Sequence, residues 1–242
     1  MIKLEDISKK YDSKEIFSHF SAEFEEHRVS CILGASGVGK TTLINIMAGL
    51  TAPDSGRVSA TDSDKTDGKI RGSYVFQEPR LLPWYNVHDN LDLVLRSARA
   101  SCDGGKTALY TKTQREELIK KQLRAVGLED YEFSPLSALS GGMLQRVSLC
   151  RAFLYPSDIL FLDEPFKELD TKLKEELYDS FFRAYENDAS RRTVIFVTHD
   201  ISEALRLADT IYVLAGSPVR IAGKINRNEF DVDAAERIKD LI

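Results

Sequence analysis

One short glycine-rich loop, between an apolar run and a helical pattern, constrains the fold of this chain most. The loop spans residues 34–41 and fits the pattern G-x-x-x-x-G-K-[ST]. Residues 29–33 before it read as a buried strand, and residues 42–49 after it read as a helix. Glycines let successive backbone N–H groups point inward at phosphate oxygens, and the helix start adds positive potential. The sequence predicts a phosphate-binding loop, and the flanking elements argue against an ordinary glycine-rich turn.

Within this loop the side chains have distinct expected roles. Lys40 would reach the β- and γ-phosphates of a nucleotide, and the Thr41 hydroxyl would hold Mg²⁺. The residues expected to surround the phosphates are Gly34, Ala35, Ser36, Gly37, Val38, Gly39, Lys40, Thr41 and Thr42.

The composition limits the classes of function. The chain has 242 residues, 43% hydrophobic and 29% charged, which is typical of one large globular domain or two modest ones. Its net charge of −5 gives no electrostatic reason to expect nucleic-acid binding. Cys31, Cys102 and Cys150 lack metal-ligand spacing, so we expect a reduced, cytoplasmic compartment. No apolar run approaches the ~20 residues that cross a bilayer, so membrane association would require another protein.

The expected elements change in character along the chain. The last third alternates short apolar runs with helical patterns, which is typical of a parallel sheet covered on both faces. The expected strands are 2–7, 17–24, 57–60, 72–76, 159–162, 194–197 and 211–214. The expected helices are 90–99, 114–126, one after Ser140, one after Asp170, 201–208 and 234–242. Residues 61–68 and 101–105 are expected to be loops.

Two carboxylates follow the apolar run 159–162. The carboxyl ends of parallel strands meet at one sheet edge, where the phosphate loop also opens. Asp163 is therefore expected to bind Mg²⁺, and Glu164 to face the water that attacks phosphorus. Asp-Glu-Pro can also be an ordinary strand-ending turn, and the phosphate loop makes the catalytic interpretation the stronger one.

Two further polar residues each follow an expected strand. His199 could donate a hydrogen bond to the γ-phosphate, although a lone histidine is more often structural. Gln77 could bridge Mg²⁺ and water, and is a weak signal by itself. We expect both residues at the edge that carries Asp163.

A second anion site is indicated at Ser140, Gly141 and Gly142, which open an apolar-faced helix. Serine alone suggests an ordinary helix cap. Two glycines in the first turn, however, cost up to ~1 kcal/mol each, and they are useful where backbone N–H groups approach an anion. Since the chain already has one phosphate loop, we expect this second phosphate to come from another subunit.

In this order the motifs resemble the ATP-binding subunit of ABC transporters. Residues 34–41 resemble its Walker A motif, Gln77 its Q-loop, 139–143 its signature, and 159–163 with Glu164 its Walker B motif. The resemblance further implies that Asp170 is the D-loop aspartate, that His199 is the switch histidine, and that Tyr11 stacks on adenine.

The resemblance implies a fold and its ligands. The expected fold is an α/β P-loop NTPase (RecA-like) core with an N-terminal antiparallel β-subdomain and an inserted helical subdomain. The core with its β-subdomain would comprise about residues 1–85 and 156–242, and the helical subdomain about 86–155. ATP and Mg²⁺ are the implied cofactors.

The implied function is ATP hydrolysis that powers a membrane transporter. ATP would lie between the Walker A motif of one copy and residues 140–142 of a second, head-to-tail copy. Residues 77–84 resemble the nitrate, sulfonate and taurine importer group, which implies a permease, an extracytoplasmic solute-binding protein and a position at the inner face of the membrane. Leu81, Leu82 and Trp84 would contact the permease if exposed, and would otherwise belong to the core.

The alternative is an ATP-gated dimerising module that regulates a non-transport partner. Co-purification with an integral membrane protein would distinguish the two. The chain also departs from the family pattern at two places. Met143 stands where the signature usually has glutamine, and Lys167 and Glu168 precede Leu169 and Asp170 of the D-loop, where the family commonly has small residues. We expect Met143 to modulate the contact with the partner's nucleotide rather than abolish it, because the backbone donors and Ser140 remain. The two charged side chains would alter the closing of the dimer or its electrostatics, and neither change removes a metal ligand or the proposed base.

Overall fold

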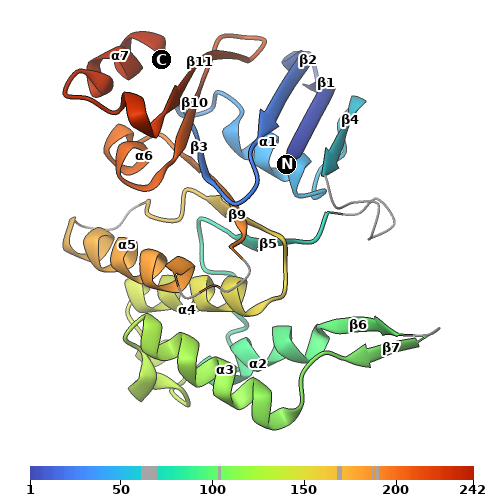
Figure 1. Ribbon diagram of the computed structural model, residues 1–242, viewed down its shortest axis with the longest axis vertical. Coiled ribbons are helices and arrows are strands. Elements are labelled where there is room, and N and C mark those ends of the chain that lie inside the picture. Colours follow the sequence, from blue (N-terminus) through green and yellow to red (C-terminus); the bar gives the residue numbers. More distant parts are fainter. Residues whose placement is uncertain (61–69, 103–104, 168–170, 187, 189–190) are drawn as a thin grey trace. The chain divides into compact units, whose positions relative to one another are not determined.

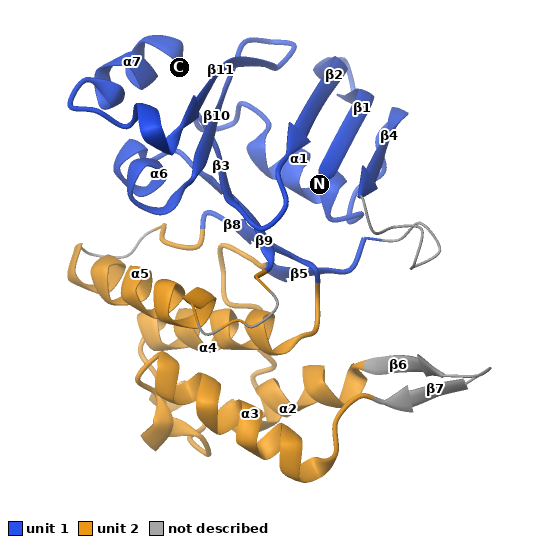
Figure 2. Cartoon of the chain, viewed as in Figure 1, with its two compact units in different colours: residues 1–74, 158–164, 192–242 blue, residues 75–157, 165–191 orange. Residues whose placement is uncertain are grey.

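A computed structural model describes residues 1–60, 70–102, 105–167, 171–186, 188 and 191–242. The expected loop at 61–68, Glu168 and Asp170 therefore lie outside the described residues. The chain forms two compact units, each built from segments that are distant in sequence (Figure 2). Unit 1 comprises residues 1–74, 158–164 and 192–242, and unit 2 comprises residues 75–157 and 165–191. The subdomain boundaries expected from the sequence stay a prediction.

The strands that carry the expected site form a six-stranded sheet (Figure 1) with the order β11-β10-β3-β9-β8-β5. Neighbouring strands from β10 to β8 run parallel, whereas β11 runs antiparallel to β10. Every residue of β3, β8 and β9 is buried, as their continuous apolar runs predict. The bounds are β3 Val29–Gly34, β5 Gly72–Val75, β8 Ile159–Asp163, β9 Thr193–Thr198, β10 Thr210–Ala215 and β11 Arg220–Asn226.

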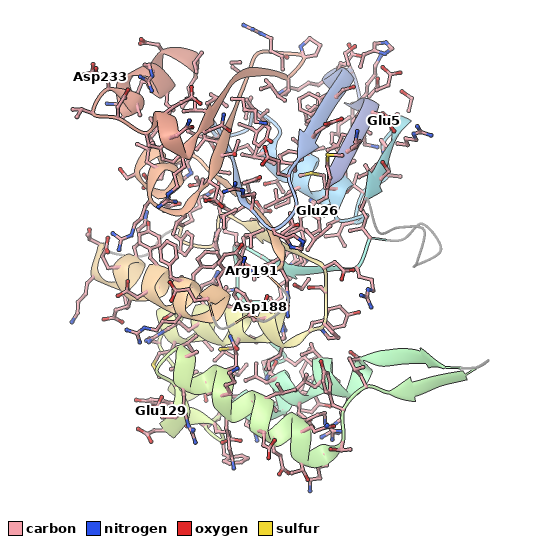
Figure 3. The ribbon with its side chains drawn as sticks, in the orientation of Figure 1. Glu5, Glu26, Glu129, Asp188, Arg191 and Asp233 are labelled. Atoms are coloured by element: carbon pink, nitrogen blue, oxygen red, sulfur yellow. The ribbon has the colours of Figure 1, made fainter. Side chains whose placement is uncertain are left out.

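A second sheet in unit 1 is antiparallel, with the order β2-β1-β4. Its strands are β1 Ile2–Tyr11, β2 Lys14–Phe24 and β4 Ser55–Ala60. Glu5 and Arg57 face each other in the register of β1 and β4 and form an ion pair of 2.6 Å. The N-terminal amine pairs with Glu26; Glu5 and Glu26 are both labelled in Figure 3.

Unit 1 has one core that the two sheets share. Phe17 and Phe24 of the antiparallel sheet belong to the same apolar cluster as Ile32 and Phe161 of the larger sheet and Leu43 of α1 Lys40–Met47. The remaining elements of this unit are α6 Ile201–Leu207, η4 Arg227–Glu229 and α7 Ala234–Leu241. The helix that follows the phosphate loop is therefore held by apolar contacts rather than by the loop alone.

Unit 2 is mainly helical. Leu91 of α2 Val87–Ser97, Leu123 of α3 Lys112–Ala125 and Val147 of α4 Gly141–Leu154 share its apolar core. The other elements are hairpin strands β6 Arg99–Cys102 and β7 Gly105–Ala108, short helices η2 Glu129–Tyr131 and η3 Leu136–Ala138, and α5 Thr171–Glu186. No described helix is both long enough and apolar enough to span a membrane.

Three details differ from the expectations. The loop expected at 101–105 is wrong, because the ends of β6 and β7 occupy its described residues. Helix α2 begins at Val87 instead of Asn90, because the Asn86 side chain caps it by accepting a hydrogen bond from Asp89 N–H at 2.8 Å. Strand β11 is not among the expected strands, because Ala222 and Gly223 interrupt the alternation of apolar and polar residues that indicates a strand.

One buried carboxylate joins two helices of unit 2. Asp92 of α2 accepts hydrogen bonds from Nε of Arg96 at 2.5 Å and Nε of Arg115, on α3, at 2.6 Å. Burial acts to raise the pKa of Asp92, but the bonds from the two guanidinium groups outweigh burial and hold this pKa below its usual value. Ionised Asp92 therefore stabilises the fold at pH values above its unfolded-state pKa, and this stabilisation is lost as pH falls through its folded-state pKa.

We predict that Asp92→Asn lowers the free energy of unfolding by about 1–3 kcal/mol near neutral pH, because it leaves a mostly buried Arg115 without its charged partner. Urea denaturation measures this change, and the difference should shrink below about pH 4. Arg96→Ala is the control, since the Arg96 side chain is 62% exposed and should contribute less than about 1 kcal/mol. Equal effects of the two substitutions would contradict this account.

Candidate functional site

The phosphate loop joins β3 to α1, and two of its glycines are required by the geometry. Gly39 precedes the helix with φ at +119°, and a Cβ there would lie 2.9 Å from Cγ2 of Ile16. A Cβ on Gly34 would lie 2.6 Å from the carbonyl oxygen of Leu214 on β10. A larger residue at either position would force the loop away from the sheet.

Lys40 places a positive charge at the centre of this loop. Its side chain is 4% exposed, and its Nζ donates hydrogen bonds to the carbonyl oxygens of Gly34 at 2.9 Å and Ala35 at 3.0 Å. Glu164 Oε1 lies 3.7 Å from the same nitrogen. Burial lowers the pKa of Lys40, and the carboxylates of Glu164 and Asp163 oppose that shift. An anion that entered the loop would meet a cation that is only partly compensated.

Asp163, at the end of β8, lies beside the start of α1. The Thr41 hydroxyl donates to Asp163 Oδ1 at 3.0 Å. The Tyr74 hydroxyl lies 3.3 Å from Oδ2 and 2.9 Å from Asn45 Oδ1, and its single proton can serve one of them. Burial raises the pKa of Asp163, whereas the Thr41 and Tyr74 hydrogen bonds oppose this shift.

These oxygens fit a magnesium ion. Mg²⁺ is typically bound by one or two protein oxygens together with substrate phosphates, and Thr41 and Asp163 offer a hydroxyl and a carboxylate in contact. A cation would also stabilise the charged form of Asp163, which burial disfavours. The described residues contain no cluster of three or more histidine, cysteine or acidic side chains that could hold a metal by themselves.

Glu164 is held in an unusual backbone conformation between two basic side chains. Its φ is +43°, and its N–H donates to the carbonyl oxygen of Val197 on β9 at 3.1 Å. A left-handed φ costs about 1–3 kcal/mol in a non-glycine residue, and such strain is concentrated at functional sites. The Glu164 carboxylate is 3.7 Å from Lys40 Nζ and 3.4 Å from His199 Nδ1. It is thus positioned beside the phosphate loop.

Five expected site residues are therefore neighbours within unit 1: Lys40, Thr41, Asp163, Glu164 and His199. They come together because β3, β8 and β9 are parallel neighbours that end at the same edge. Tyr74 is the residue that sequence reasoning missed. A tyrosine inside a strand carries no local signal that its hydroxyl faces Asp163.

The other expected residues are placed as follows. Gln77 is exposed and follows β5, and it belongs to unit 2 together with the start of α4. There Ser140 caps the helix by accepting a hydrogen bond from Met143 N–H at 3.3 Å. Gly141 is open to solvent, whereas a Cβ on Gly142 would lie 3.2 Å from Cδ2 of Leu173. Packing against Leu173 thus explains why glycine occupies position 142, whether or not an anion binds there.

Tyr11 ends β1 with an exposed ring. The residue is 47% exposed, and Lys9 Nζ lies 5.4 Å from the ring centroid. Of the remaining loop residues, Ala35, Ser36 and Gly37 are exposed, whereas Val38 and Thr42 are partly buried. The roles expected for these residues stay predictions.

Comparison with known proteins identifies the family. The ABC transporter family model matches residues 17–167, which is more than half of the chain. The nitrate import ATP-binding protein NrtD of Synechococcus elongatus is 37% identical, over 83% of this chain and 70% of that protein. The bicarbonate transport ATP-binding protein CmpD of the same species is 32% identical, over 92% and 78%. This chain belongs to the ABC transporter family.

Within that family the chain is an ATP-binding subunit and an ATPase. Solved structures agree on the P-loop NTPase fold. A dimeric ATP-binding cassette bound to ADP and phosphate superposes with a TM-score of 0.74 at 24% identity, over 94% of this chain and 99% of that one. CbiO1 of Clostridium perfringens, part of the ABC transporter complex cbiONQ, has a TM-score of 0.78 at 22% identity, over 99% and 93%. The expected family and fold class are confirmed.

The buried charge of Asp163 predicts a stability effect with a definite pH dependence. Since burial raises the folded-state pKa of Asp163, the ionised carboxylate destabilises the fold above that pKa, and the penalty disappears as pH falls toward the unfolded-state pKa. Asp163→Asn should therefore melt higher than the unsubstituted subunit near pH 8, by about 2–4 °C per kcal/mol removed, and the gap should close near pH 4.

Thermal unfolding without nucleotide measures this difference. Exposed Asp130→Asn is the control, and its melting temperature should match the unsubstituted subunit at both pH values. A lower melting temperature of Asp163→Asn near pH 8 would contradict the assignment of a desolvated carboxylate.

Proposed function

We propose that this subunit hydrolyses ATP to power the import of a small solute, of the nitrate, bicarbonate, sulfonate or taurine kind. The relatives named for nitrate import and bicarbonate transport support this choice, as does the segment 77–84 noted above. The observation that carries the hydrolytic role is the placement of Glu164 between Lys40 and His199 beside the phosphate loop.

When ATP binds, the γ-phosphate would replace the backbone carbonyls as the partner of Lys40 Nζ. Lys40 Nζ donates hydrogen bonds to two backbone carbonyls and lies near Glu164. The γ-phosphate is a stronger partner for an ammonium group than a neutral carbonyl is. Tyr11 would stack on the adenine ring, and residues 34–42 would surround the phosphates.

Glu164 would then orient the attacking water and accept its proton. Water attacks the γ-phosphorus, the bond to the β-phosphate oxygen breaks, and ADP and phosphate form. His199 would donate a hydrogen bond to the γ-phosphate, as Lys40 does. Thr41, Asp163 and Gln77 would hold Mg²⁺, which neutralises phosphate charge when it is bound.

Each ATP would be shared between two copies of the subunit. The start of α4 would contact the phosphates held by the partner copy, through the exposed Ser140 and Gly141 and the buried Gly142. ATP then stabilises the closed dimer because it contacts both subunits only in that state, and hydrolysis releases it. Asp170 would lie in this interface by family resemblance.

We predict that Glu164→Gln slows hydrolysis by about a hundredfold or more while ATP still binds, because the amide cannot accept the proton of water. The result should be an ATP-dependent dimer visible by size-exclusion chromatography. Lys40→Ala should instead weaken ATP binding itself, since the loop loses its cation. Unchanged turnover in Glu164→Gln would remove this residue from its proposed role.

The permease contact is proposed at an exposed aromatic pair in unit 2. Trp84 and Tyr85 are 73% and 38% exposed, and their rings lie 6.4 Å apart. Of the two alternatives for Leu81, the structure favours the core, because Leu81 packs against the helical core; Leu82 is partly buried. An aromatic pair of this kind suits a short helix of a membrane protein.

Buried Asn90 gives this loop a defined shape. Its Oδ1 accepts from Leu82 N–H at 2.8 Å, and its Nδ2 donates to the carbonyls of Asn86 at 2.9 Å and Leu82 at 3.2 Å. The aromatic pair thus sits on a backbone that is organised before any partner binds. Through this contact the subunit would lie at the cytoplasmic face of the membrane, with a solute-binding protein on the outer side.

We predict that Trp84→Ala reduces co-purification with the permease by about tenfold, because truncation of an exposed interface tryptophan commonly removes a large part of the binding energy. Pull-down from detergent-solubilised membranes measures it. Val232→Ala is the control, because Val232 is a 96% exposed apolar residue of unit 1, whereas Trp84 belongs to unit 2. Equal loss of co-purification in both variants, or loss in neither, would contradict the docking role of Trp84. Separately, ATP-driven dimers that form without any membrane partner would favour the regulatory alternative.

A further inference from the structure

The chain passes from unit 1 to unit 2 beside two residues of the proposed site. Unit 1 includes Tyr74 and unit 2 begins at Val75, two residues before Gln77. Farther along, Glu164 belongs to unit 1 and Pro165 to unit 2. The backbone at these two crossings therefore helps to set where Gln77 and Glu164 can lie.

One buried side chain of unit 2 forms hydrogen bonds with the chain just after residue 75 and at residue 165, where the chain enters unit 2. Gln145 of α4 is 4% exposed, and its Nε2 donates hydrogen bonds to the carbonyl oxygens of Pro165 at 3.0 Å and, more weakly, Phe76 at 3.5 Å. Both partners can only accept, so the nitrogen side of the carboxamide must face them. One amide group thus connects the residue before Gln77 with the residue after Glu164.

Stability alone does not explain a glutamine at this position. Its Oε1 is buried and meets no hydrogen-bond donor among the described residues. A buried acceptor without a donor opposes folding. The side chain therefore holds two carbonyls at the expense of leaving its own oxygen unsatisfied, which is a pattern found at functional positions.

The same helix carries the proposed contact with the partner's ATP. Ser140 caps α4, and Gln145 lies in the second turn of that helix. A displacement at the helix start therefore moves the carboxamide and the carbonyls bound to it. Pro165 restricts this connection, because its ring fixes φ and leaves only ψ to turn its carbonyl relative to the Glu164–Pro165 peptide bond.

We propose that Gln145 is a positioning residue that connects the signature helix to the backbone beside Gln77 and Glu164. When residues 140–142 of this subunit contact the ATP held by the partner copy, Gln145 would align the hydrolysis site of this subunit. This inference depends on the ATP-sandwich dimer proposed above. Gln145 itself contacts no substrate, so its loss should impair hydrolysis more than ATP binding or dimerisation.

The test compares Gln145→Met with the matched control Gln122→Met. Methionine keeps the length of glutamine but donates no hydrogen bond, and Gln122 lies in the same unit and holds neither crossing segment. For Gln145→Met we expect kcat to fall by about tenfold or more, because small misplacements of catalytic groups have large effects, while the Kd for ATP stays within about threefold. The control should change neither quantity. A kcat of Gln145→Met within about twofold of the unsubstituted subunit would overturn the proposal.

Measuring ATP-dependent dimer formation distinguishes failure of this inference from failure of the proposed function. Glu164→Gln combined with Gln145→Met should still form the ATP-dependent dimer, since Ser140 is intact. If Glu164→Gln alone forms no dimer, the proposed function fails. If Glu164→Gln forms the dimer and the double variant does not, Gln145 acts on assembly and the positioning role is wrong.

A second variant tests the hydrogen bonds directly and does not depend on how well methionine packs. In Gln145→Glu the ionised carboxylate would face two carbonyl oxygens and repel them, whereas the protonated acid can donate one hydrogen bond. The kcat of this variant relative to the unsubstituted subunit should therefore rise by about threefold or more between pH 8.5 and 6.5. A ratio that is independent of pH would overturn the proposal.

Discussion

The buried ammonium group of Lys40 is the interaction on which the rest of the site depends. It is almost inaccessible to solvent, yet its partners are two neutral backbone carbonyls and a carboxylate 3.7 Å away. Burial disfavours its charge, and the two carboxylates at the end of β8 compensate only in part. The parallel order of β3, β9 and β8 is what brings those carboxylates to it. In the proposed complex, a triphosphate would supply the negative charge that this arrangement lacks.

Catalytic competence and stability oppose each other here. Asp163 is desolvated, and Glu164 adopts a left-handed φ, so the site contains unfavourable features that a more stable protein would avoid. The core of unit 1 offsets them, because aromatic residues of the antiparallel sheet pack against the larger sheet and α1. In unit 2, Gln145 has the same character, since its buried oxygen is unsatisfied while its nitrogen holds two segments. In each case the polar groups that disfavour folding are those that the proposed function uses.

Much of the site could be predicted from local patterns. Continuous apolar runs indicate buried parallel strands, and parallel strands end at one edge, so the proximity of Asp163, Glu164 and His199 follows from position alone. Contacts between distant residues could not be predicted in this way. The Tyr74 hydroxyl and the Gln145 carboxamide act through partners 89 and 20 residues away, and neither stands in a pattern that indicates a partner. The loop expected at 101–105 was wrong because a polar, glycine-containing segment is equally typical of a hairpin.

The most direct test is a crystal structure of the subunit with Mg²⁺ and a non-hydrolysable ATP analogue. The account predicts that Lys40 Nζ contacts the γ-phosphate, that Thr41 and Asp163 lie at the metal, and that Ser140 of a second copy approaches the same phosphate from the other side. A triphosphate bound away from Lys40, or a Ser140 that remains remote from every phosphate in each assembly formed, would contradict it.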